Sequence, residues 1–141
     1  MGRISGIWIV GVSLLLTACS AAPASIAESE HTGGLPAEAI TVTQDSSGRD
    51  LAYPFPTAGW LDGGARFAVV LAGSSSCPAF PSSIDVADAY TIKLGLDTRG
   101  GPACTADMAP RTYIIRTPSD IDSSRQVTLL FGETTVALPP L

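Results

Sequence analysis

Serine, histidine and lysine side chains could supply nucleophilic chemistry, but this chain places few of them together. Ser74, Ser75 and Ser76 follow one another, yet the surrounding letters GSSSC differ from the Gly-x-Ser-x-Gly turn of serine hydrolases. The single histidine, His31, lies in a stretch of low complexity, and the single lysine, Lys93, lies on the polar face of an alternating segment. We therefore expect no catalytic site here. The serines should bond turn backbone, with contact to a ligand or partner as the alternative.

Aspartates are more numerous, and paired carboxylates could hydrolyse a glycosidic bond if they faced a groove about 5–9.5 Å apart. A small β domain has little room for such a cleft, so a hydrolase is the remote alternative. Asp120 and Asp122 could also offer oxygen ligands to Ca²⁺, but their loop lacks the glycine and the terminal glutamate of an EF-hand. We predict no enzyme activity, metal or cofactor. The aspartates considered are Asp85, Asp88, Asp97, Asp107, Asp120 and Asp122.

The N-terminus carries the signals of export. Residues 7–16 are apolar apart from Ser13, and Arg3 is the only charge before Glu28. As a helix, such a run would rise about 15 Å, half of a hydrocarbon core of roughly 30 Å. A stable membrane span is therefore not expected, and residues 1–18 are predicted to be a signal peptide that is removed.

The residues that follow have a more specific pattern. Leu16-Thr17-Ala18-Cys19 resembles the lipobox of bacterial lipoproteins, an aliphatic residue and two small residues before a cysteine. The resemblance implies that the Cys19 thiol takes a diacylglyceryl group and becomes the new N-terminus, with further acylation such as palmitate. The alternative is an ordinary secreted protein with a chance cysteine. Two or more acyl chains suffice for stable anchoring in a bilayer.

Cys77 and Cys104 then remain as an even pair in an exported domain, where thiols tend to be oxidised. We predict a disulfide between them, which by a chain-entropy estimate contributes about 3.5 kcal/mol. Two free buried thiols are the alternative. The sequence has no Cys-x-x-Cys pair and no histidine in the expected folded part, so neither a redox cysteine nor a zinc site is expected.

Composition separates a tether from a domain. Residues 19–39 are mostly Ala, Ser, Gly, Pro and Glu, so they are predicted to be a flexible tether. A short amphipathic helix near residues 24–30 is the alternative. From Ile40 to Leu141 short alternating segments recur between Gly, Pro, Ser and Asp, which predicts an all-β sandwich or open barrel of about seven short strands. The expected core residues are Phe67, Val69, Leu71, Ile84, Val86, Ile92, Leu94, Leu96, Tyr113, Ile115, Val127, Leu129 and Val136.

Trp60 stands among glycines, in the letters AGWLDGG. Such a tryptophan can be a platform on which a ligand stacks, but it more often covers one end of a sandwich core. We keep both interpretations open, with the core position favoured.

The formal net charge is -5, and 15% of residues are charged. Neutralising phosphates requires a surplus of Lys and Arg, so nucleic acid is not an expected partner.

Several segments resemble a group of small uncharacterised lipoproteins of high-GC Gram-positive bacteria. The matching letters are WLDGG at 60–64, GSSSCP at 73–78, IDV at 84–86, YTI at 90–92 and GPACTADMAPRTY at 101–113. The resemblance covers about residues 57–117 and implies an envelope lipoprotein with a disulfide-bonded β domain.

The expected function is a lipid-anchored module on the extracytoplasmic face of the cell membrane. Its partner would be an envelope protein, a wall polymer or a small ligand. The alternative is an inhibitor or accessory subunit of an envelope enzyme or transporter, with Ser74–Ser83 as its recognition loop.

Overall fold

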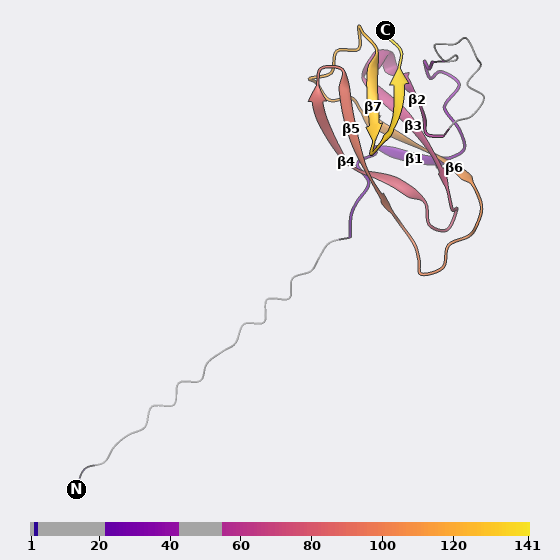
Figure 1. Cartoon of the computed structure of the whole chain (residues 1–141), viewed down its shortest axis with the longest axis vertical. Helices are drawn as coiled ribbons and strands as arrows, with labels where there is room; N and C mark the ends of the chain where they lie inside the picture. Colours follow the sequence, from indigo (N-terminus) through magenta and orange to yellow (C-terminus); the bar gives the residue numbers. More distant parts are fainter. Residues whose placement is uncertain (1, 3–21, 43–54) are drawn as a thin grey trace.

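A computed structural model describes residues 2, 22–42 and 55–141, and it shows a β-sandwich of two four-stranded sheets (Figure 1). The first sheet has the order β1-β6-β3-β2 and the second the order β4-β5-β7-β8. The all-β prediction is confirmed, and the sandwich form is the one adopted. The strands are β1 (Ser29–Thr32), β2 (Thr57–Leu61), β3 (Arg66–Gly73), β4 (Ala79–Asp88), β5 (Thr91–Thr98), β6 (Ala109–Arg116), β7 (Val127–Phe131) and β8 (Thr134–Leu138).

Neighbouring strands are antiparallel except β5 and β7, which pair in parallel. Between these two, the chain crosses to the first sheet to form β6. The crossing places one connection, residues 99–108, at the end of the sandwich where β3 also ends. The return connection, residues 117–126, lies at the other end.

The tight β2–β3 connection follows from its glycines. Asp62, Gly63 and Gly64 have φ values of 50, 62 and 93° and form a short 3-10 turn. Glycine adopts this left-handed region without steric cost. The turn joins β2 and β3, which pair antiparallel as a hairpin.

The core lies between the sheets and contains aromatic residues from both. Trp60 and Phe67 are fully buried, with their ring centroids 6.2 Å apart in an edge-to-face arrangement. The Tyr113 hydroxyl, from the first sheet, donates a hydrogen bond of 2.6 Å to the Ala79 carbonyl of the second sheet. Most of the predicted core is buried, but Leu96 is 42% exposed. Its prediction as a core residue is wrong, because it lies near the exposed end of β5.

The structure corrects the predicted tether, because residues 26–33 belong to the domain. The Ile26 amide donates to the Pro81 carbonyl of β4 at 3.0 Å, and the Glu28 amide donates to the Ile114 carbonyl of β6 at 2.8 Å. Ser29–Thr32 then forms β1 along the edge of β6. We call residues 26–33 the strap, since they join the edges of both sheets. The alternative of a helix near residues 24–30 is also wrong.

The strap is held by charge as well as by backbone hydrogen bonds. Its two glutamates pair with arginines from both sheets. These pairs are Glu28–Arg116 at 2.6 Å, Glu28–Arg66 at 3.9 Å, Glu30–Arg99 at 2.7 Å and Glu30–Arg111 at 3.4 Å. The acidic residues that suggested a solvated tether are therefore part of the domain surface.

Strand pairing is irregular at two places. β4 continues through Asp88 with a bulge after Val86. Ile40 forms only an isolated bridge with Trp60. Within the described ranges, no helix is long and apolar enough to cross a membrane.

Candidate functional site

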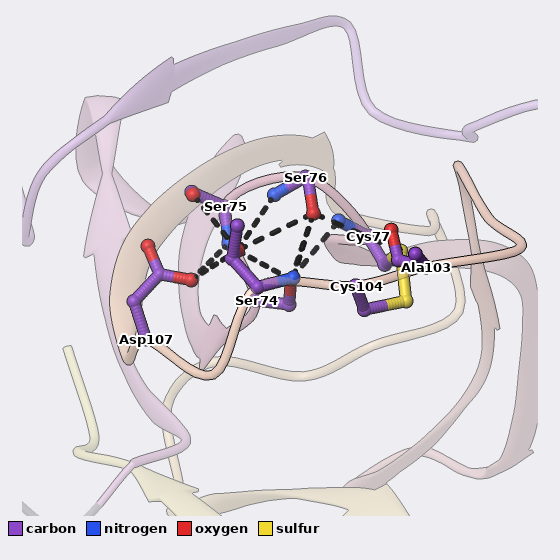
Figure 2. The surroundings of a disulfide bond; sticks show 8 residues. Ser74, Ser75, Ser76, Cys77, Ala103, Cys104 and Asp107 are labelled. Carbon is purple, nitrogen blue, oxygen red and sulfur yellow. Dashed lines mark hydrogen bonds between the residues drawn. A yellow bond between two sulfur atoms is a disulfide. The ribbon is translucent and has the colours of Figure 1, made fainter.

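Two loops at one end of the sandwich are joined by the Cys77–Cys104 disulfide, with the two Cα atoms 5.4 Å apart. One loop, residues 74–78, follows β3, and the other, residues 99–108, follows β5. The predicted disulfide is confirmed. Figure 2 shows the three consecutive serines between Asp107 on one side and the disulfide on the other.

Hydroxyl groups from both loops meet beside the disulfide. The Thr105 amide donates to Ser76 Oγ at 2.9 Å, and the Cys77 amide donates to Ser74 Oγ at 3.2 Å. The Ser75 amide donates to Asp107 Oδ1 at 3.0 Å. These contacts satisfy turn backbone groups, as the sequence predicts for a serine-rich loop.

Thr105 is the centre of this cluster. Its Oγ1 lies 2.5 Å from Asp107 Oδ1 and within 3.5 Å of the hydroxyls of Ser74, Ser75 and Ser76. A hydroxyl donates one hydrogen bond and accepts two. Its proton goes to the carboxylate, which is the closest and the only charged acceptor, so at most two of the other contacts are made at once.

Asp107 supplies the carboxylate of this cluster. Hydrogen bonds from Ser75 and Thr105 hold the pKa of Asp107 well below its usual value. A carboxylate with a lowered pKa is a weak general base, since an effective base has a pKa near the working pH. The arrangement can fix the loops and present a rigid polar surface.

The longer loop, residues 99–108, is exposed, and contacts at its start hold it in place. Every residue from 100 to 108 is exposed, and the Met108 side chain is 73% exposed. Gly100 has a φ of 88°, and a Cβ at this position would lie 2.2 Å from the Ser76 carbonyl oxygen. At the base of the loop, Arg99 lies over the Phe80 ring at 4.4 Å and pairs with Glu30 of the strap.

The structure overturns one predicted contact residue. Trp60 has 0% exposure, and its Nε1 donates to the Pro139 carbonyl at 2.7 Å. It is therefore a core residue and offers no stacking surface. The expected recognition loop Ser74–Ser83 is also shorter than predicted, because β4 begins at Ala79 and Phe80 is fully buried.

The remaining candidates are not brought together. His31 lies in β1, in register with Thr112, away from the serine cluster. Asp88 accepts the Tyr90 amide at 2.8 Å, and Asp122 accepts the Ser124 amide at 3.0 Å, so each holds a local turn at the end of the sandwich opposite Asp107. Within residues 22–42 and 55–141, no three His, Cys, Asp or Glu side chains are grouped to hold a metal ion. Cys19 lies outside the described residues.

Sequence reasoning missed Thr105 as a site residue and considered Asp107 only as one of several carboxylates. A signal for the contact between the two loops was present, because a disulfide brings its flanking residues together and Ser76 and Thr105 flank the two cysteines. The Thr-x-Asp pattern is also typical of a turn closed by side-chain hydrogen bonds.

No protein-family profile, curated protein or solved structure matches this chain. The candidate function therefore depends on the residues and geometry described above.

Proposed function

We propose that this protein is an exported lipoprotein, anchored through an acylated Cys19 on the outer face of the cell membrane, and that its sandwich is a binding or structural module of the envelope. Its partner is an envelope protein, a wall polymer or a small ligand near that membrane. The proposal rests on Cys19, which follows the apolar run and two small residues.

The cysteine pairing supports this proposal. Cys77 and Cys104 form the disulfide, which leaves Cys19 as the one cysteine of the chain outside that pair. Disulfides persist in oxidising compartments, which agrees with export. The chemistry of the loop cluster favours binding over catalysis, because its hydroxyls are engaged with one another and its carboxylate is a weak base.

Fractionation of cells that carry Cys19→Ala tests the anchor. The wild type and the control variant Ser20→Ala should sediment with membranes, because each keeps the acylated residue. Cys19→Ala should lose the lipid and leave the membrane fraction. A Cys19→Ala protein that stays with membranes as fully as the wild type does would refute the proposal.

A further inference from the structure

β1, the strand within the strap, is the least buried strand of the sandwich. All four of its residues are exposed, and no other strand of the described ranges has this pattern. Ile26 and Ala27, which precede it in the strap, are only partly buried where they pack against the core. A segment with few buried apolar contacts opens at a lower free energy than the rest of a fold. Among the strands, β1 is therefore the one that separates from the sandwich most readily.

The strap is fixed more firmly at its C-terminal end. The fully buried Thr112 hydroxyl lies 2.9 Å from the carbonyl oxygens of both Gly33 and Gly34. Just beyond them, Leu35 and Ala39 pack against a second apolar cluster on β2, β3 and β6. Gly33 has a φ of 111°, a conformation that glycine adopts without steric cost. These contacts make Gly33 the natural pivot for a strap that swings away from β6.

Four arginines from both sheets meet the two glutamates of the strap. They are Arg66, Arg99, Arg111 and Arg116. Among the residues that the structure describes, only Asp62 gives any of them another acidic partner in an ion pair. The whole chain has 13 acidic residues against 8 basic ones, so this side of the sandwich is a local concentration of positive charge. Without the strap, it would attract an acidic partner.

The strap also shows which chemistry this side of the sandwich accepts. Its backbone amides donate three hydrogen bonds of 2.8–3.0 Å to carbonyl groups of β4 and β6, and β1 pairs with β6 over four residues (Figure 1). A sugar or a phosphate chain has no row of amides to make these bonds. Ile26 packs against the core, and the carboxylates two and four residues later reach the arginines. The β6 edge therefore fits an extended peptide with the pattern aliphatic-x-acidic-x-acidic.

We propose that the strap is displaceable and that the β6 edge beneath it binds an extended acidic segment of another envelope protein, which adds a strand to the first sheet. This proposal rests on the proposed function, because it selects one of the partner classes named there. The strap occupies the edge until the partner replaces it. The apparent affinity for the partner is therefore lower than the intrinsic affinity by the fraction of molecules whose strap is open.

A peptide with the strap's own sequence, IAESEHTG, is the probe, and fluorescence anisotropy at low salt measures its binding. The protein is the chain from residue 19 onward with Cys19→Ala, which keeps all eight strands and the disulfide and has no free thiol. Adding Glu28→Gln/Glu30→Gln should make it bind the peptide about fivefold more tightly, because its own strap competes less well while the four arginines remain. The matched control Glu133→Gln should bind as weakly as the protein with the unchanged strap.

Equal affinity in these three proteins, or no binding to any of them, would overturn the proposal. Equal binding of the peptide IAQSQHTG, whose acidic side chains are replaced by amides, would overturn it as well. No lipid is present in this experiment. Its failure would therefore leave the anchor at Cys19 untouched, and the fractionation of Cys19→Ala cells tests that anchor separately.

A matched pair of arginine variants locates the site. In the Glu28→Gln/Glu30→Gln protein, Arg111→Gln should weaken peptide binding about threefold, because Arg111 no longer pairs with the strap and is free to pair with the peptide. Arg125→Gln, which changes an arginine over the Tyr90 ring, should leave the affinity unchanged. Equal losses would show that the peptide responds to overall charge and would contradict the site. If the protein instead elutes as a dimer, the strap of a second copy occupies the edge, and the assignment to another protein is overturned.

Discussion

Trp60 and Asp107 show how single residues in this protein acquire their roles from their surroundings. Trp60 stands among glycines, yet those glycines form the turn that lets its ring enter the core. Asp107 is fully exposed to solvent, yet it holds two loops together by accepting hydrogen bonds from Ser75 and Thr105. In both cases the neighbours decide what the side chain does.

Replacing Trp60 tests its position in the core. Trp60→Ala should lower the free energy of unfolding by about 3–5 kcal/mol, because it removes a fully buried ring and leaves a cavity. Urea denaturation measures the loss. Leu96→Ala is the control, and its exposed side chain should contribute about 0.5 kcal/mol or less. A Trp60→Ala loss as small as that of the control would show that the ring is not a core element.

Asp107 should make stability depend on pH. Its folded pKa is lowered by the hydrogen bonds from Ser75 and Thr105, so the ionised form stabilises the fold. This contribution is complete above the unfolded pKa of about 4 and is lost as the pH falls through the lower folded value. The difference in urea midpoint between wild type and Asp107→Asn should therefore be largest at neutral pH and shrink in acid. A difference that is the same at neutral and acid pH would contradict this role.

Among the elements, the strap has the widest set of contacts described above, because it touches both sheets. β1 pairs with the edge of β6 and protects it, because an unpaired strand edge is open to association with other chains. The strap also reaches β4 in the other sheet through Ile26. One short segment thus closes one side of the sandwich and leads from the domain toward Cys19.

Removing the strap's two carboxylates should loosen it. Each ion pair is partly exposed, and such pairs contribute about 1 kcal/mol or less. The double variant Glu28→Gln/Glu30→Gln should lose about 1 kcal/mol at low salt and less at high salt. In this variant the backbone amides of residues 28 and 33 should exchange hydrogen faster, while the exchange of the β3 amides stays unchanged. The control is Glu133→Gln, which changes an exposed site in the β7–β8 turn. Equal hydrogen-exchange rates at residues 28 and 33 in both variants would show that the ion pairs do not hold the strap.

Sequence patterns predicted the strands that carry apolar side chains and missed the one strand that carries none. The alternation from Ile92 to Leu96 and the run from Arg66 to Ala72 mark β5 and β3, because buried strands need apolar side chains at fixed intervals. β1 has the sequence Ser-Glu-His-Thr, and every one of its residues is exposed. An edge strand of this kind depends on backbone hydrogen bonds, which are not visible in side-chain patterns. The contacts of Thr105 require two distant loops to meet, so only the fold reveals them.

At the scale of the whole molecule, the disulfide and the strap secure different regions. The bond between Cys77 and Cys104 joins the two loops at one end, and the strap joins the two sheets along one side. At the end away from the disulfide, Asp88 and Asp122 accept hydrogen bonds from turn backbone amides.

Loss of the disulfide should cost a large share of global stability. Cys77→Ala/Cys104→Ala should lower the free energy of unfolding by about 2–4 kcal/mol, mainly by freeing the unfolded chain. Thermal or urea unfolding of the oxidised wild type and the variant gives the difference. Cys19→Ala keeps the disulfide and should unfold like the wild type. The prediction fails if both variants lose the same amount.

The intact mass of the protein extracted from cell membranes, measured without reduction, tests the central claim most directly. The account predicts a chain that begins at Cys19, carries the added mass of a diacylglyceryl group with or without further acylation, and is two hydrogens lighter because Cys77 and Cys104 are joined. A chain that begins at another residue, or that has an unmodified Cys19, would contradict it.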